Sequence, residues 1–164
     1  MSASQPLRFS VLTFDELDIH QLHELLKLRV DVFILEQECV YPEIDGRDPE
    51  SVHILGHQGD QLVAYARWYF RPPKDQDERE AAGGPERPVA VLGRILTASS
   101  ARGQGLGRDL VAHALEALRD HAVRISAQHH LEAFYQSLGF RTTSPEPYDW
   151  DGIPHIDMVL AAQT

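Results

Sequence analysis

A short glycine-rich segment, Arg102-Gly-Gln-Gly-Leu-Gly107, lies between an apolar stretch that predicts a strand and an amphipathic stretch that predicts a helix. The first backbone N–H groups of a helix have no partner within it and carry a partial positive charge. Glycines remove the side chains that would keep an anion away from these groups. The segment therefore predicts an anion site at a helix start, although a tight strand-to-helix turn would explain it equally well.

The charge pattern around this segment favours the anion site. The chain has a formal net charge of −10, with 25 acidic residues among 164. From Ala90 to Arg108 there is no Asp or Glu, where about three would be expected by proportion. Three arginines occur in the same window: Arg94, Arg102 and Arg108. The acidic balance of the whole chain argues against a general nucleic-acid or anionic-membrane binder, because both need a basic face.

Composition predicts one globular domain over residues 1–164, with 43% apolar residues and no stretch long enough for a membrane span. The segment Met1–Pro6 lacks the order of a secretion signal, so we expect a cytoplasmic protein. Cys39 is the only cysteine, which excludes an internal disulfide and a thiolate metal cluster. Adjacent His129 and His130 would point about 100° apart on a helix, so we expect no metal site.

The elements that position the glycine-rich segment alternate between strands and helices. Strands are expected at Leu7–Phe14, His53–Gln58, Leu62–Phe70, Val89–Leu96, Val123–Ala127 and His155–Leu160, with a further short one at Phe140–Thr143. Helices are expected from a capping box at Asp18 to Ile34, at Arg108–Leu118, and at Leu131–Leu138 before Gly139. This order predicts an α/β (α+β) fold, with a mixed central sheet of about six to seven strands flanked by about four helices.

Two segments show no apolar periodicity. Residues 72–88 contain paired prolines, paired glycines and crowded charges, and we expect a mobile loop there. The segment 36–50 is also loop-like, and its acidic residues are Glu36, Glu38, Glu43, Asp45, Asp48 and Glu50. We interpret this run as a solvated loop, with a pocket for a cationic amine as the sharper alternative. Arg29 lies on an apolar helix stripe and is expected to pair with an acid or to keep its head in water.

Two nucleotide-binding fingerprints do not fit the glycine-rich segment. The P-loop needs Lys-Ser/Thr after its last glycine, but Arg108 and Asp109 follow here. The dinucleotide fingerprint Gly-x-Gly-x-x-Gly needs a different glycine spacing. The pattern Arg-x-x-Gly-x-Gly, formed by Arg102, Gly105 and Gly107, instead resembles the coenzyme A pyrophosphate loop of the GNAT (Gcn5-related N-acetyltransferase) superfamily.

The resemblance extends over nearly the whole chain and is nearest to the ElaA-like branch of that superfamily. Leu131–Phe140 resembles the family's fourth-helix motif, in which an aromatic pair is followed by Gly-Phe. The other matching segments are Leu28-Arg29, Val32-Phe33, Glu36-Gln37, Tyr41-Pro42, Asp45-Gly46, His53–Gly56, Leu62–Arg67, Gly93-Arg94 and Asp151–Ile156. The insertion at 72–88 departs from the family pattern.

The resemblance implies an N-acetyltransferase that moves an acetyl group from acetyl-coenzyme A to a primary amine by direct attack. Coenzyme A would be held by the backbone of Ile95, Leu96 and Thr97 and by Arg102, Gly103, Gln104, Gly105, Leu106, Gly107 and Arg108. Tyr135 would act as general acid for the departing thiolate, and a backbone N–H near Leu96 would stabilise the carbonyl oxygen. The base stays open among Glu36, Asp45, His53, His155 and a water chain.

The expected partner is a small-molecule or peptide amine, with no nucleic acid, no membrane and no metal, and pairing into a homodimer is common in the resembled family. Two alternative functions remain. One is a non-catalytic module that binds or senses coenzyme A. The other is an acyl-homoserine lactone synthase, because Arg29, Val32-Phe33 and Glu36 also resemble the N-terminal region of that enzyme group.

Overall fold

The computed structural model describes residues 5–39 and 41–163. The chain divides into two compact units. The first comprises residues 1–69 and 94–114, and the second comprises residues 70–93 and 115–164. Strands β3 (Gln61–Arg71) and β4 (Val89–Thr97) and helix α3 (Leu106–Ala117) each contribute residues to both units.

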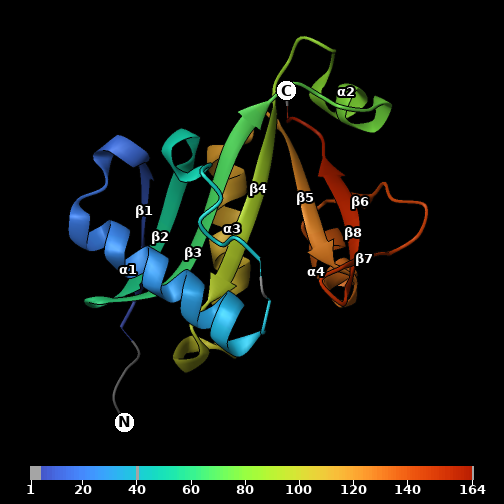
Figure 1. Ribbon diagram of the computed structural model, residues 1–164. Helices are drawn as coiled ribbons and strands as arrows, with labels where there is room; N and C mark the ends of the chain where they lie inside the picture. Colours follow the sequence, from blue (N-terminus) through green and yellow to red (C-terminus); the bar gives the residue numbers. More distant parts are fainter. Residues whose placement is uncertain (1–4, 40, 164) are drawn as a thin grey trace. The chain divides into compact units, whose positions relative to one another are not determined.

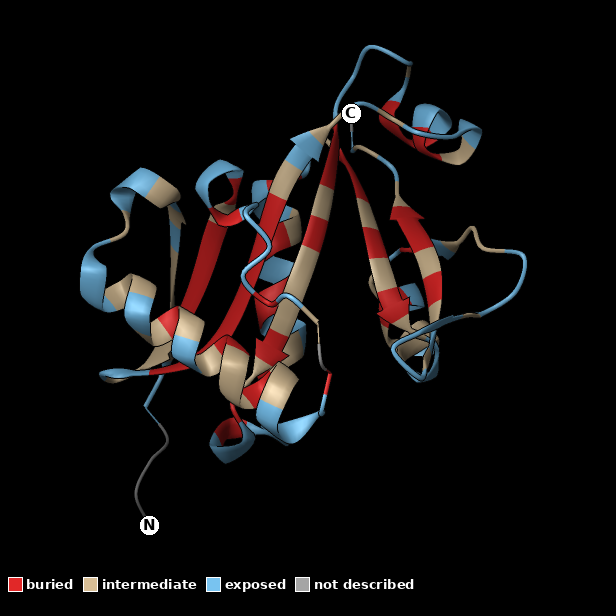
Figure 2. Ribbon diagram, viewed as in Figure 1, coloured by how far each residue is buried: buried red, intermediate tan, exposed pale blue. Residues whose placement is uncertain are grey.

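The strands of the first unit follow the hydrogen-bonded order β1-β2-β3-β4. Strand β1 (Leu7–Thr13) pairs antiparallel with β2 (Val52–Gln58), which pairs antiparallel with β3. The expected β2–β3 hairpin is confirmed, and Gly59 opens its turn with φ +58°. That left-handed angle suits glycine because an added Cβ is disfavoured there. Figure 2 shows buried residues along β2 and β3, so these strands form the core of the unit.

Helix α1 (Ile19–Arg29) begins at the capping box predicted from the sequence. The Gln21 N–H donates to Asp18 Oδ1 at 2.8 Å, and the Asp18 N–H donates to Gln21 Oε1 at 3.0 Å. The helix continues as a π-helix over Val30–Glu36. Its Leu25 packs in the core with Leu55 of β2 and other apolar side chains. Figure 1 shows α1 crossing these strands on one face of the sheet and α3 on the other.

The strands of the second unit follow the order β4-β5-β8-β6, with β7 paired to β8. Strand β5 (Ala122–Gln128) runs parallel to β4, and their pairing covers Val89–Val91 of β4. Strand β8 (Ile153–Leu160) is antiparallel to β5, to β6 (Arg141–Thr142) and to β7 (Tyr148–Trp150). Helix α4 (Glu132–Gln136) precedes Gly139, whose φ of +99° fits the left-handed cap expected from the sequence.

The expectation that residues 72–88 lack regular structure is wrong, because helix α2 (Gln76–Ala82) lies within them. Asp75 caps its start, accepting from the Glu78 N–H at 2.8 Å, and Gly83 ends it with φ +80°. The buried face of α2 consists of Ala81, Ala82 and Glu78, and Arg71 binds the Glu78 carboxylate through two hydrogen bonds of 2.7 and 2.8 Å. Two alanines and a paired glutamate carry little apolar signal, so the sequence pattern missed the helix.

The alternation of helices with a mixed sheet confirms the predicted α/β (α+β) class. The described residues form eight strands and four α-helices, rather than six to seven strands. The short strand expected near Phe140–Thr143 is present as β6, and β7 was not expected. In the described part of the chain, no helix is long and apolar enough to cross a membrane.

Candidate functional site

The glycine-rich segment forms an open loop between β4 and α3. Gly103 and Gly105 have φ angles of +78° and +76°, in the left-handed region that favours glycine. A Cβ added at either position would meet no atom within 4 Å, so open space surrounds both residues. The N–H of Asp109 donates to the carbonyl of Gly105 at 3.2 Å, which starts the helical ladder. The N–H groups of Leu106 and Gly107 precede this ladder, so they have no acceptor within the helix and can face an anion.

Two further contacts position this loop within the first unit. The Gln58 side chain of β2 donates from Nε2 to Gln104 Oε1 at 3.1 Å. Arg102 donates from Nη2 to the Thr97 carbonyl at 3.3 Å, which ties the loop to the end of β4. Leu96, beside Thr97, is buried in the core. The predicted coenzyme A residues 95–97 and 102–108 thus belong to one unit, on consecutive elements.

Arg102 also forms an ion pair with Glu36 at the end of the π-helix. The contact joins a residue expected to bind pyrophosphate with one expected as a candidate base. Both side chains are partly exposed, at 43% for Arg102 and 36% for Glu36. A pyrophosphate bound at the loop would compete with Glu36 for the same guanidinium.

We expect Glu36→Gln to tighten coenzyme A binding by about 2- to 5-fold, because an exposed ion pair of about 0.2–1 kcal/mol no longer competes. The measurement is the Kd for coenzyme A by calorimetry. Glu50→Gln is the matched control, since Glu50 pairs with Arg47 at 2.7 Å on the surface. Weaker binding in Glu36→Gln would contradict competition and would mean that Glu36 orients Arg102 for the ligand.

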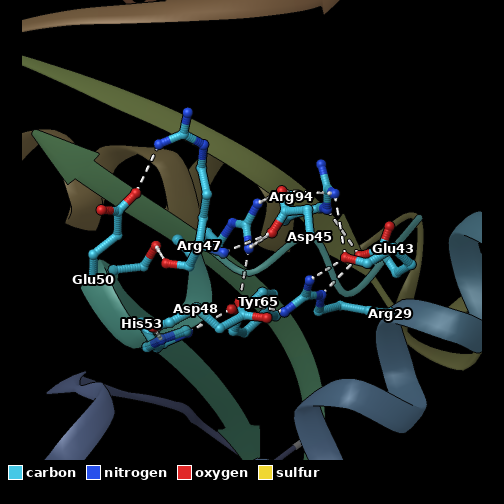
Figure 3. A network of polar contacts seen from close by, with 11 residues as sticks. Arg29, Glu43, Asp45, Arg47, Asp48, Glu50, His53, Tyr65 and Arg94 are labelled. Atoms are coloured by element: carbon cyan, nitrogen blue, oxygen red, sulfur yellow. Dashed lines mark hydrogen bonds and ion pairs between the residues drawn. The ribbon is translucent and has the colours of Figure 1, made fainter. Parts of the chain in front are cut away.

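Acids of the segment 36–50 form a buried network of ion pairs with Arg29 and other arginines (Figure 3). Arg29 is fully buried and donates from Nε to Glu43 Oε1, from Nη1 to Asp48 Oδ1 and from Nη2 to the Glu43 carbonyl, each at 2.7 Å. The expectation that Arg29 pairs with an acid is therefore confirmed. Buried charges of this kind are tolerated only when they are paired and hydrogen-bonded.

Two more arginines complete the network. Arg67 donates to both oxygens of Asp45 at 2.9 and 2.5 Å and to Asp48 at 2.8 Å. Arg94 donates from Nε to Glu43 Oε1 at 2.8 Å. Its backbone has φ +52°, an uncommon angle for a residue with a Cβ inside a strand. Three guanidinium groups thus face three carboxylates, and the charges of the network balance.

This network shows that the interpretation of the acidic run as a solvated loop is wrong for Glu43 and Asp48, whereas Glu36, Glu38, Asp45 and Glu50 are exposed. Glu43 and Asp48 are 5% and 4% exposed. The alternative, a pocket for a cationic amine, also loses its basis here, because arginines already neutralise Glu43, Asp45 and Asp48. Burial alone would raise the pKa of Asp45, but hydrogen bonds and charge from Arg67 lower it to about 2. A carboxylate with that pKa is a poor proton acceptor at neutral pH, so Asp45 is not a suitable base.

His53, another candidate base, is fully buried beside the network. Its Nε2 lies 3.0 Å from the Asp48 carbonyl, which can only accept, so Nε2 carries the proton. Nδ1 then accepts from the Tyr65 hydroxyl at 2.6 Å. Burial lowers the pKa of His53. A neutral imidazole with both nitrogens bonded has no free lone pair for an acceptor amine.

Tyr135 and His155, the remaining predicted catalytic residues, lie in the second unit. Tyr135 is 5% exposed, and its ring makes edge contacts with Phe134 and Phe140 at centroid distances of 5.0 and 5.8 Å. Burial raises the pKa of Tyr135 to about 12. His155 is half-buried, and its Nδ1 lies 2.8 Å from the Ile153 carbonyl. The Ile153 carbonyl can only accept, so Nδ1 carries a proton, and Nε2 is the nitrogen whose lone pair can accept one.

Comparison with known proteins agrees with the fold. The family described as "Acetyltransferase (GNAT) domain" matches residues 27–162. The chain belongs to this family. It is 43% identical to the protein ElaA of Escherichia coli K12 over 149 residues, covering 87% of this chain and 89% of ElaA. These matches support an acyltransferase, and the GNAT fold family uses acyl-coenzyme A.

Two solved structures are similar over almost the whole chain. The crystal structure of Escherichia coli ElaA has a TM-score of 0.79 at 38% identity, covering 94% of this chain and 99% of that one. An acyl-CoA N-acyltransferase from Pseudomonas aeruginosa has a TM-score of 0.80 at 37% identity, covering 95% and 100%. The chain therefore has a GNAT fold. Among its described residues, no group of three or more His, Cys, Asp or Glu side chains could hold a metal ion.

Proposed function

We propose that this GNAT protein transfers an acetyl group from acetyl-coenzyme A to a primary amine by direct attack, with residues 1–164 working as one domain. The observation that carries the proposal is the open loop at the start of α3. There, two left-handed glycines leave room beside the N–H groups of Leu106 and Gly107 at the helix start, and Arg102 adds positive charge. A pyrophosphate needs these features, since its charge is matched by a helix N-terminus and its oxygens by backbone donors.

Proton transfer in this reaction involves the amine, a base and the leaving thiolate. The ammonium form of the acceptor gives one proton to a base and attacks as the neutral amine. Among the four candidate bases, the contacts of Glu36, Asp45 and His53 described above leave His155 Nε2 as the best supported acceptor. When the amide forms, the amine nitrogen loses a second proton, and the departing thiolate gains one proton. The products are therefore the amide and the free thiol.

The role of Tyr135 depends on its raised pKa. A thiol has a pKa of about 8.5, so complete proton transfer from a tyrosine at about 12 is unfavourable by roughly 5 kcal/mol. We therefore propose that the Tyr135 hydroxyl stabilises the thiolate as a hydrogen-bond donor and does not lose its proton completely. At neutral pH the hydroxyl is always protonated, which keeps the donor available.

We expect Tyr135→Phe to lower kcat by about 10²-fold, the usual loss for one hydrogen-bond donor to a developing anion. The Kd for acetyl-coenzyme A should stay within about twofold, because the hydroxyl acts on the leaving group only. Steady-state kinetics and a binding titration measure the two quantities. Tyr69→Phe, which also removes one hydroxyl, is the control. An unchanged kcat would assign Tyr135 to packing alone.

The direct test of the proposed function is an acceptor panel that follows free coenzyme A thiol. Acetyl-coenzyme A and longer acyl-coenzyme A donors are each offered to small amines, amino acids and peptides. Amine-dependent thiol release, fastest with the acetyl donor, supports the proposal. Tight coenzyme A binding without thiol release from any amine would instead identify the non-catalytic module predicted as an alternative.

A further inference from the structure

The hairpin formed by β7 and β8 presents aromatic and acidic side chains together on the second unit. Tyr148 pairs with His155 in the register of the two strands, and Trp150 pairs with Ile153. The turn between them is Asp151-Gly152, with φ angles of +52° and +80°. Two consecutive left-handed residues of this type form the tight hairpin turn that Asp-Gly favours. The turn therefore fixes which side chains of the two strands lie next to each other.

The aromatic side chains of this hairpin form a continuous row. The His155 ring lies 6.2 Å from the Tyr148 ring at an interplanar angle of 27°, and 5.6 Å from the Trp150 ring at 48°. Trp150 is 51% exposed, whereas Trp68, the other tryptophan, is 3% exposed. The Tyr148 hydroxyl donates to Asp157 at 2.7 Å, and Asp157 pairs with Arg124 at 2.8 Å. One end of the row is thus anchored, and the other end faces solvent.

The charge around this row is negative and largely uncompensated. From Thr142 to Thr164 the sequence has no Lys or Arg, but four acids, namely Glu146, Asp149, Asp151 and Asp157. Within the described residues, Asp157 is the one member of this set that forms an ion pair. Asp149 and Asp151 are exposed: Asp151 lies in the turn next to Trp150, whereas Asp149 is on the opposite face of β7, because side chains alternate along a strand. These exposed acids differ from Glu43, Asp45 and Asp48, whose carboxylates are neutralised by arginines.

We propose that the surface formed by Tyr148, Trp150 and His155, with Asp151 in the adjoining turn, binds the acceptor amine as a small alkylammonium ion. A cation is attracted to the face of an aromatic ring, most strongly to tryptophan. The carboxylate of Asp151 in the adjoining turn adds charge attraction, and His155 Nε2 can accept a hydrogen bond from the ammonium group. The assignment of the bound amine as acyl acceptor rests on the proposed function, but its binding does not.

The test uses putrescine, a diamine, and 1,4-butanediol, its uncharged counterpart of the same length. In a Trp68→Phe background, the tryptophan fluorescence comes from Trp150 alone. We expect saturable quenching by putrescine in the millimolar range and none by 1,4-butanediol, in the absence of any acyl donor. Equal responses to the two compounds would overturn the proposal, because the surface would then recognise carbon chains without regard to charge.

Variants locate the binding surface. Calorimetry should show putrescine binding weakened about 2- to 5-fold in Trp150→Ala, and about 2- to 5-fold in Asp151→Asn, as expected for exposed contacts of this kind. The matched controls are Phe70→Ala, an exposed aromatic that also contacts a histidine (His121, at 4.8 Å), and Asp120→Asn, an exposed acid. Equal effects of test and control variants would overturn the proposal.

Two further outcomes separate this inference from the proposed function. Retained putrescine binding without acetyl transfer to any amine would leave the inference intact and overturn the proposed function. Acetyl transfer with an unchanged KM for putrescine in Trp150→Ala would overturn the inference alone. A lysine-containing peptide that binds at least about tenfold more tightly than putrescine, which is about 1.4 kcal/mol, would overturn the assignment to a small amine.

Discussion

Replacing Gly105 with glutamate is expected to raise the Kd for coenzyme A by about 10³-fold, roughly 4 kcal/mol, while the protein stays folded. Open space surrounds a Cβ at this position, so the new side chain meets no protein atom close to the backbone. Its carboxylate would instead lie beside the helix N–H groups and repel the pyrophosphate that is proposed to bind them. Calorimetric titration with coenzyme A measures the loss, and circular dichroism checks the fold.

Two control variants separate this charge effect from backbone strain. Gly105→Ala puts a Cβ at φ +76° without adding charge, so it should weaken binding only slightly. Gly83→Glu places the same carboxylate at nearly the same angle, φ +80°, at the end of α2. We expect coenzyme A binding to be unchanged in Gly83→Glu. If Gly105→Glu binds coenzyme A as tightly as the unmodified protein does, the loop is only a turn of the chain and does not bind the pyrophosphate.

The sequence could predict this loop because its features are local. A left-handed backbone needs glycine, and a helix start follows from the apolar stripe that begins at Leu106. The capping box at Asp18 and the Gly59 turn were predictable for the same reason, since each depends on residues within a few positions. Local chemistry of this kind leaves a direct pattern in the sequence.

The ion-pair network could not be predicted in the same way, because its members are brought together by the fold. Arg29 and Asp48 are 19 positions apart, and Arg94 and Glu43 are 51 apart. The sequence does contain a weak signal, since Arg29 lies on an apolar helix stripe and Arg67 is a single charge in an apolar run. That signal predicts that each arginine has a buried acidic partner, but it does not identify the partner. The acidic segment was therefore interpreted as solvated.

The same limit applies to the catalytic residues. The motif around Tyr135 predicted its helix, but not that burial raises the pKa of its hydroxyl to about 12 and weakens it as an acid. His155 and Trp150 come together through the register of β7 and β8, and β7 was not expected at all. The pairing of a short strand depends on its turn and on long-range contacts. A strand of three residues, such as β7, is too short to show an apolar periodicity in the sequence.

Replacing Arg29 with methionine is expected to lower the free energy of unfolding by about 3–5 kcal/mol, the usual cost of removing one partner from a buried ion pair. Methionine fills much of the volume of the arginine stem, so packing is largely kept. The loss comes from Glu43 and Asp48, which stay buried while three donated hydrogen bonds disappear. Urea unfolding followed by tryptophan fluorescence measures the change.

Arg47→Met is the matched control, because Arg47 pairs with Glu50 at 2.7 Å but both side chains are about half exposed. Its loss should stay below about 1 kcal/mol, as for other surface pairs. If Arg29→Met does not fold, Arg29→Lys still tests the network. Lysine keeps the charge but cannot donate as a planar fork to Glu43 and Asp48 together, so an intermediate loss is expected. Stability losses in both Arg29 variants as small as that of Arg47→Met would show that the network contributes no more than an exposed ion pair.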